Sequence, residues 1–110
     1  METTAKEVAR SSYFFNDVLD LYLYGKETFG ERAADIFYED ILYQVRRLNV
    51  QYLLNPECRH LPTKTQKYRN IILGSYLIIY RMTPKRIEVL RALHGSQSPK
   101  IFKNAKRITI

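Results

Sequence analysis

Hydrophobic residues recur at helical spacing near the start of the chain. Three of them are separated by four and three positions, namely Phe15, Leu19 and Tyr22. This spacing predicts a helix over residues 12–24, because positions three and four apart share one helical face. Ser12 is a residue type that caps helix N-termini well, and Gly25 readily takes the left-handed conformation that ends many helices.

A longer apolar stripe follows Gly30. Its members are spaced by four, four, three and four residues: Phe37, Ile41, Val45, Leu48 and Tyr52. This second predicted helix must end shortly before Pro56, because proline lacks an N–H group and disfavours a helical residue before it. The short connection over residues 26–29 predicts an antiparallel helix hairpin spanning about residues 12–54. Such a hairpin leaves a broad apolar face that later residues must cover.

Three segments after Pro56 are rich in Ile, Val, Leu and Tyr, and Gly74-Ser75 and Thr83-Pro84-Lys85 separate them at hairpin lengths. The segments are residues 68–73, 76–82 and 86–94. They predict a meander of three antiparallel strands that packs on the helices. Both alternating faces of the middle segment are largely apolar, as expected of a central strand.

Two further segments are less regular. Lys6 to Arg10 is predicted to add a strand, and residues 100–110 form either a short helix or an edge strand. We therefore expect an α+β fold in one domain, residues 1–110. Its N-terminal antiparallel helix hairpin packs on a C-terminal antiparallel sheet of three to four strands over about residues 68–94, and a basic tail follows over residues 95–110.

The composition is that of an ordinary globular protein. Of the 110 residues, 45% are hydrophobic and 26% are charged, which excludes a disordered or collagen-like chain. The longest apolar run, residues 71–80, is broken by Gly74 and Ser75 and is shorter than the roughly 20 residues that a membrane helix needs. The N-terminus lacks the apolar core of a secretory signal, and the single cysteine, Cys58, has no partner for an internal disulfide. We expect a cytoplasmic protein with no membrane contact.

Positive charge is concentrated in the second half of the chain. Residues 1–55 carry six Lys or Arg and nine Asp or Glu, a net charge of −3, whereas residues 56–110 carry twelve and two, a net charge of +10. A surface of this kind attracts nucleic acid through counterion release, or an acidic protein through complementary potential. Charge alone does not separate these two partners, and a merely solvated surface remains the third interpretation.

The residues that could carry chemistry are few. The sequence has no glycine-rich phosphate loop, no paired-cysteine zinc spacing and no nucleophile elbow, so we expect no metal site and no cofactor. Any catalysis would have to use Arg, Lys, His and Tyr. That set suits metal-independent RNA cleavage, which needs a base for the 2′-hydroxyl, cations for the phosphorane-like charge and an acid for the leaving oxygen. The candidates on or beside the predicted sheet are Arg69, Tyr80, Arg81, Arg91 and His94.

Each candidate also has a structural interpretation. Alternation along the last strand places Arg91 and His94 on opposite sides of the sheet. His94 would then cap the sheet by hydrogen bonding, and His60 would lie in a surface loop. Arg81 would extend its charge to solvent at the end of the sheet. Arg91 would pair with Glu88 or with an acid of the helices.

The order of helix hairpin, basic connection, three-strand meander and terminal histidine resembles the RelE/ParE superfamily of bacterial type II toxins. The similarity covers roughly residues 8–102. Its motifs are Tyr68-Arg69-Asn70-Ile71-Ile72-Leu73, Ser75-Tyr76-Leu77-Ile78-Ile79-Tyr80-Arg81, and Ile87-Glu88-Val89-Leu90-Arg91-Ala92-Leu93-His94-Gly95-Ser96-Gln97-Ser98-Pro99. The resemblance implies a toxin whose cognate antitoxin wraps it with an acidic or amphipathic segment. RelE-like members cut messenger RNA in the ribosome, whereas ParE-like members poison DNA gyrase.

Three positions depart from the RelE-like pattern. Leu77 stands where RelE-like toxins have an arginine, and Gly95-Ser96-Gln97 lacks the arginine of the following turn. Phe102 best matches the catalytic tyrosine and has no hydroxyl. Losing one positioned group commonly costs about a hundred- to a thousandfold in rate, so these departures favour the ParE-like interpretation.

Three hypotheses follow. The first is a ParE-like toxin that inhibits growth through gyrase and is neutralised by a cognate antitoxin. The second is a ribosome-dependent mRNA endonuclease that uses His94, Arg69 and Arg81. The third is a noncatalytic basic domain that binds nucleic acid. The residues expected to bind nucleic acid or antitoxin are Lys64, Lys67, Arg69, Arg81, Arg91, Lys100 and Lys103.

Overall fold

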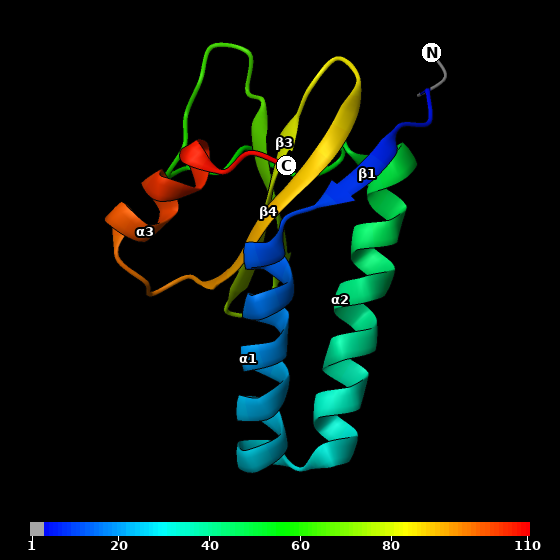
Figure 1. The fold of residues 1–110 in the computed structure, drawn as a ribbon, viewed down its shortest axis with the longest axis vertical. Coiled ribbons are helices and arrows are strands. Elements are labelled where there is room, and N and C mark those ends of the chain that lie inside the picture. Colours follow the sequence, from blue (N-terminus) through cyan, green and yellow to red (C-terminus); the bar gives the residue numbers. More distant parts are fainter. Residues whose placement is uncertain (1–3) are drawn as a thin grey trace.

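A computed structural model describes residues 4–110 and shows an α+β fold, as expected (Figure 1). Two long helices precede most of the sheet, and short helical turns follow it. In chain order the elements are β1 (Glu7–Arg10), α1 (Ser12–Phe29), α2 (Glu31–Gln51), β2 (Tyr68–Leu73), β3 (Tyr76–Met82), β4 (Arg86–His94), α3 (Pro99–Asn104) and the 3-10 helix η1 (Ala105–Arg107). In this described range no helix is long and apolar enough to cross a bilayer.

Helix α1 begins at Ser12, as the sequence predicts, but it ends later than predicted, at Phe29. Ser11, rather than Ser12, is the N-cap: its Oγ accepts a hydrogen bond from the Phe14 N–H at 3.0 Å. The helix continues through Gly25 to Phe29, so the predicted end at Gly25 and the predicted connection over residues 26–29 are wrong. Gly30 alone joins α1 to α2, because its φ of 93° is available at little cost only to glycine.

The buried face of α1 also differs from the predicted stripe. Phe14 and Val18 enter the core, whereas Phe15 and Leu19 are 55% and 56% exposed. Both pairs have the same spacing of four residues, so helical periodicity alone does not show which of two adjacent apolar stripes faces the sheet. In α2 the predicted stripe is the buried one, with Ile41, Val45 and Leu48 all in the core.

The predicted bounds of β2, β3 and β4 are confirmed, and β3 is central as expected. The sheet order is β1-β4-β3-β2, and the β2–β3 and β3–β4 pairs are antiparallel. Because β1 is parallel to β4, the four-stranded sheet is mixed rather than wholly antiparallel as predicted. The additional strand β1 is also confirmed, and it lies parallel to β4 with Val8 opposite Ile87. A β-bulge interrupts the β3–β4 pairing, because Ile79 faces Arg91 while Tyr80 faces Val89 and Leu90 is left as the extra residue.

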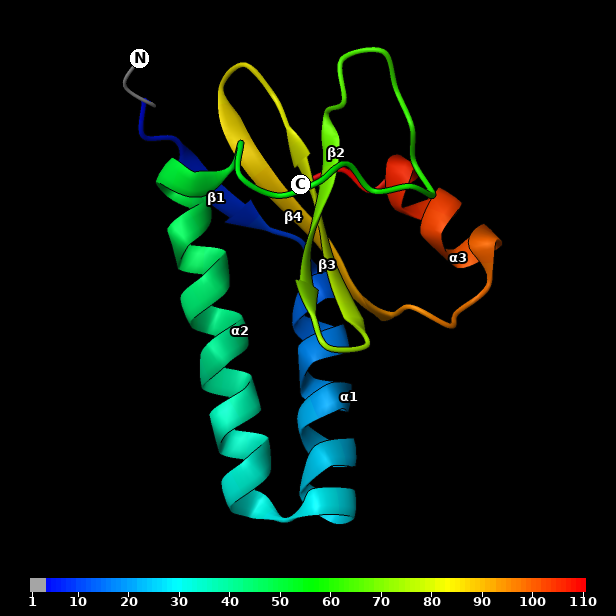
Figure 2. The same cartoon turned by 180° about the vertical axis from the view of Figure 1, so that it is seen from behind.

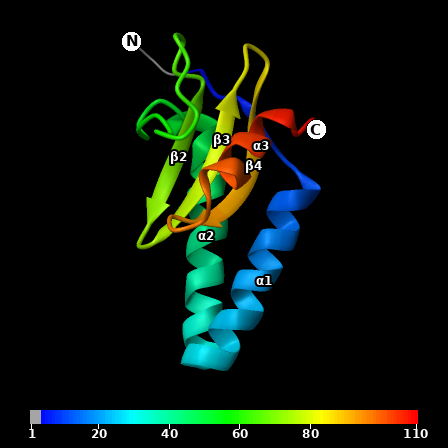
Figure 3. The same cartoon turned by 90° about the vertical axis from the view of Figure 1, so that its left-hand side faces the viewer.

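The sheet separates two hydrophobic cores (Figure 3). Helices α1 and α2 pack on one face, over side chains such as Ile78, Tyr80 and Val89. The loop after α2, together with α3 and η1, packs on the other face. Its buried members include Cys58, Leu61, Leu90, Phe102 and Ala105. The C-terminal tail therefore forms a short helix that covers the sheet instead of an edge strand.

We predict that Gly25→Ala stabilises the protein. An added Cβ would lie 3.6 Å from the Ala34 Cβ, which is ordinary van der Waals contact, and Gly25 lies inside a helix where glycine costs about 0.5–1 kcal/mol relative to alanine. Urea denaturation followed by circular dichroism should show a gain of about that size in the free energy of unfolding. Gly30→Ala is the matched control and should lose about 1 kcal/mol or more, because of its positive φ. A loss of stability in Gly25→Ala would contradict this account.

Candidate functional site

Arg69 is occupied in tying the loop after α2 to the sheet. Its Nη1 donates to the main-chain oxygens of Leu53 and Asn55 at 3.0 and 2.9 Å, and its Nε donates to that of Gln66 at 3.3 Å. The loop adds its own main-chain contacts to β2, including a bridge between Glu57 and Arg69. Two nitrogens of the guanidinium, Nε and Nη1, therefore bind main-chain carbonyls of the connection between α2 and β2.

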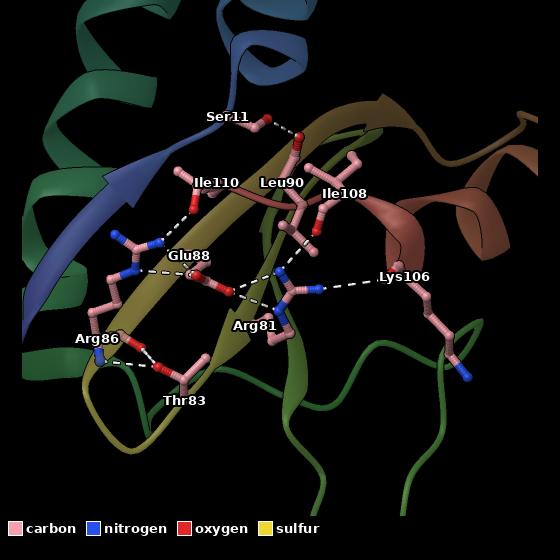
Figure 4. A network of polar contacts seen from close by, with 9 residues as sticks. All are labelled: Ser11, Arg81, Thr83, Arg86, Glu88, Leu90, Lys106, Ile108 and Ile110. Atoms are coloured by element: carbon pink, nitrogen blue, oxygen red, sulfur yellow. Dashed lines mark hydrogen bonds and ion pairs between the residues drawn. The ribbon is translucent and has the colours of Figure 1, made fainter.

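Arg81 belongs to a polar network on the α3 side of the sheet (Figure 4). Its Nη2 lies 2.7 Å from the Glu88 carboxylate and donates to the Ile108 main-chain oxygen at 2.8 Å. Arg86 approaches the other carboxylate oxygen at 2.9 Å and donates to the Ile110 main-chain oxygen at 2.8 Å. The solvent-directed arrangement considered for Arg81 is therefore not observed: its charge is neutralised within the sheet.

Glu88 carries its negative charge although it is only 8% exposed. Burial raises the pKa of its carboxyl group, but the hydrogen bonds and charges of Arg81 and Arg86 outweigh burial and hold the pKa below its ordinary value. Two cations are thus fixed around one buried anion.

Arg91 pairs with an acid of the helices, which is one of the two predicted alternatives. Its Nε and Nη2 donate to both Asp17 carboxylate oxygens at 2.7 and 2.9 Å, a bidentate geometry. Asp17 also accepts from the Ala92 N–H at 3.0 Å, and the hydrogen bond to Asp17 raises the pKa of Arg91. The simple alternation that places Arg91 beside Ile87 and Val89 is wrong, because the bulge at Leu90 shifts the strand by one residue.

His94 is fixed in one tautomer at the end of β4. Its Nδ1 accepts a hydrogen bond from the Ser96 N–H at 3.0 Å and lies 2.6 Å from the Ser96 Oγ. A ring nitrogen that accepts a main-chain N–H carries no proton, so the proton of the neutral ring is on Nε2. The Tyr76 ring packs against His94 edge-on at 5.1 Å. This hydrogen bonding at the sheet end matches the structural interpretation of His94.

His94 and Arg81 lie at opposite ends of β3. The strand pairing sets Tyr76 opposite His94 and sets Arg81 opposite Glu88. Five residues of extended chain span about 17 Å, which exceeds the reach of two groups acting on one phosphate. The structure therefore does not bring His94 together with Arg81.

Both histidines line one hollow beside the β2–β3 turn. Its volume is about 620 Å³, and its walls include Arg59, His60, Asn70, Ser75 and His94. His60 lies in the loop between α2 and β2, as predicted, and it is half-buried because its ring stacks on Phe102 with centroids 4.0 Å apart. Its buried Nε2 has no hydrogen-bond partner within residues 4–110. The same range holds no group of three or more side chains placed to bind a metal ion.

The four lysines predicted to bind a partner remain exposed. Lys64 and Lys67 lie in the loop before β2, and Lys100 and Lys103 lie on α3. Lys67 Nζ is 5.5 Å from the centroid of the Tyr68 ring, and Lys106 of η1 approaches the same ring at 5.9 Å. Lys67 of the loop and Lys106 of η1 therefore both lie over Tyr68. We use the term positive surface for the exposed cations of the loop before β2 and of the α3–η1 segment.

The family model described as the ParE toxin of the type II toxin-antitoxin system parDE matches residues 8–99. The chain belongs to the ParE toxin family. A solved structure described as the chromosomal ParDE TA system from P. aeruginosa is similar in fold, with a TM-score of 0.67 and 18% sequence identity. That match covers 84% of this chain and 98% of the other. No curated protein matches significantly.

The positions that depart from the RelE-like pattern are structural in this ParE-family chain. Leu77 packs against the core on the α3 side of the sheet. Phe102 is fully buried beneath His60. Neither position presents an acid, a base or a cation to the hollow.

Sequence reasoning missed three exposed cations of the positive surface, namely Arg59, Lys106 and Arg107. A signal for Lys106 was present. Phe102, Ala105 and Ile108 are buried at spacings of three, so Lys100, Lys103 and Lys106, with the same spacing, belong to the opposite, exposed face.

We predict that Glu88→Gln destabilises the ParE fold by about 2–3 kcal/mol at pH 7, because it leaves two guanidinium groups without their shared anion. The lowered pKa of Glu88 stabilises the native state above the ordinary value of 4.5, and this contribution is lost as pH falls through the lower native pKa. Unfolding free energies measured from pH 7 to pH 3 should therefore fall less steeply in Glu88→Gln than in the natural protein. Glu39→Gln, at an exposed position of α2, is the control. Equal behaviour of the two variants would refute the role given to Glu88.

Proposed function

We propose that this ParE-family toxin arrests bacterial growth by binding DNA gyrase, and that a cognate antitoxin neutralises it. Family membership supports a toxin of a type II system. The absence of a bilayer-spanning helix within residues 4–110 and the unpaired Cys58 support action in the cytoplasm, where gyrase and a separately encoded antitoxin would both be available.

The observation that carries this proposal is the internal use of the groups that RNA cleavage would need. Arg69 holds loop carbonyls, and Arg81 is paired with Glu88. His94 uses Nδ1 as an acceptor of a main-chain N–H, so its ring cannot act as a base through that atom while the bond persists. An arrangement of this kind supports inhibition by binding in preference to acid–base catalysis.

The outer face of the helix hairpin supports a protein partner. Phe15, Leu19, Tyr22 and Tyr38 line a groove between α1 and α2 with a volume of about 380 Å³. Several other large apolar side chains of the hairpin are exposed, among them Leu23, Tyr24, Phe29 and Ile36. Exposed apolar clusters of this size are typical of protein interfaces. An antitoxin with an amphipathic segment would cover such a face.

Expression tests the proposal directly. Induction of the chain in a bacterium should stop growth at confirmed soluble expression, and co-expression of the antitoxin encoded beside it should restore growth. The purified toxin should inhibit the supercoiling of relaxed plasmid by gyrase, and the antitoxin, added in equimolar amount, should relieve the inhibition. Normal growth at confirmed soluble expression would count against a toxin. Arrested growth with unaffected gyrase would count against the gyrase target.

His94→Ala distinguishes inhibition by binding from the RelE-like alternative. The variant should arrest growth as the natural chain does if the toxin acts on gyrase. If the chain instead cuts mRNA with His94, Arg69 and Arg81, the variant should lose about a hundredfold or more in cleavage rate, and mapped cuts should appear only with the natural chain. The feature that favours this alternative is the hollow lined by both His60 and His94, where an RNA substrate would have to bind. Circular dichroism should confirm that the variant is folded.

A further inference from the structure

We use the term cationic face for seven exposed cations of the loop before β2 and of the α3–η1 segment: Arg59, Lys64, Lys67, Lys100, Lys103, Lys106 and Arg107. They come from the loop before β2 and from the α3–η1 segment, which lie next to each other on one side of the sheet (Figures 1 and 2). Residues 59–67 and 99–107 contain no Asp or Glu. The same loop holds one acid, Glu57, whose carboxylate accepts from the Thr63 N–H at 3.1 Å, so one negative charge stands against the three cations of the loop.

The cationic face is held in place by the fold. Stacking of His60 on Phe102 joins the loop to α3. Arg81 donates to the Ile108 main-chain oxygen and so fixes the chain just after η1. The loop is anchored in turn by Arg69. A surface fixed in this way loses little conformational entropy when it meets a rigid, charged partner.

The side chains of the cationic face favour a nucleic acid over a protein. Within the described chain, the exposed large hydrophobic side chains lie outside residues 59–67 and 99–107. Between the cations stand polar residues such as Thr65, Gln66 and Asn104. A protein interface would need an apolar, desolvated centre, whereas a phosphate backbone needs mainly fixed cations and polar donors.

The position of the aromatic rings favours a duplex over a single strand. Tyr68 is only 4% exposed and has Lys67, Lys106 and Arg81 over its ring, while Phe102 is fully buried. Tyr13, at the margin of the face, has the Arg91 guanidinium over its ring at 5.7 Å. Single strands are bound largely through bases stacked on free aromatic faces. Tyr68 and Phe102 are buried, and Tyr13, although 53% exposed, has the Arg91 guanidinium over its ring. Contacts to phosphates alone suit an intact double helix.

We propose that the cationic face binds the phosphate backbone of duplex DNA without sequence preference. This deepens the proposed function, because gyrase acts on duplex DNA and the toxin would hold enzyme and DNA together. Only the joint binding of gyrase and DNA rests on the proposed function. DNA binding is a property of the chain alone and is measured without gyrase.

The experiment follows the fluorescence anisotropy of a labelled 20-base-pair duplex of mixed sequence across a salt titration. We expect a dissociation constant on the order of 10 μM at physiological salt, and the same value for an unrelated duplex sequence. Lys64→Gln, Lys67→Gln and Lys106→Gln combined should flatten the slope of log K against log salt by about 2–3, and weaken binding at least about 30-fold. The matched control combines Lys26→Gln, Arg32→Gln and Arg46→Gln, which removes the same charge from exposed positions on the hairpin. It should leave the slope nearly unchanged.

The outcomes separate the two proposals. No binding to duplex DNA at low salt, or equal losses in both triple variants, would overturn the cationic face as a DNA site. Tighter binding to a single strand would overturn the choice of duplex, and equally tight binding to polyglutamate would overturn the choice of DNA. Gyrase inhibition without DNA binding would leave the proposed function standing and refute this inference. DNA binding without effect on gyrase or growth would support this inference and refute the proposed function.

Discussion

The fold of the C-terminal half depends on one buried anion. The Glu88 carboxylate neutralises Arg81 and Arg86, and each of these arginines donates to a main-chain oxygen of the last three residues. The chain after β4 is thereby brought back across the sheet, which places α3 over the second core. Two guanidinium groups this close would repel each other without the carboxylate between them. The position of the lysines on α3 and η1 therefore depends on an acid that lies in a different element.

Arginine and lysine have different roles in this molecule, and their chemistry explains the difference. Four of the five strand arginines, at positions 69, 81, 86 and 91, make planar, multiple contacts to carboxylates or carbonyls. A guanidinium has five donors in a fixed plane and is weakly hydrated, so it suits such partly buried sites. A lysine ammonium is strongly hydrated, and the lysines of the cationic face keep theirs in solvent. The net charge of the sequence therefore overestimates the number of strand cations that a partner can contact.

Much of the fold could be predicted from local signals, and the exceptions share a physical cause. The strand bounds followed from Gly74-Ser75 and Pro84, whose conformational preferences act over a few residues. The predicted helix end at Gly25 is wrong because glycine occurs both at helix ends and inside helices. The packing of α1 on α2 decides between these two positions. The bulge at Leu90 has no local signal, since it is a property of pairing between two strands. The partner of Arg91 lies 74 residues away, so spacing could offer only alternatives.

The bulge at Leu90 also determines how the outer edge of β4 is closed. Strand β1 pairs only as far as Val89, and beyond it the main-chain groups of β4 face polar side chains at the start of α1. Ser11 Oγ donates to the Leu90 oxygen at 2.6 Å, and Asp17 accepts from the Ala92 N–H. These two side chains take the place of a strand for the Leu90 oxygen and the Ala92 N–H. The surfaces left open are the apolar hairpin and the cationic face, on opposite sides of the sheet. A toxin built this way could hold a protein on one side while it contacts a polyanion on the other.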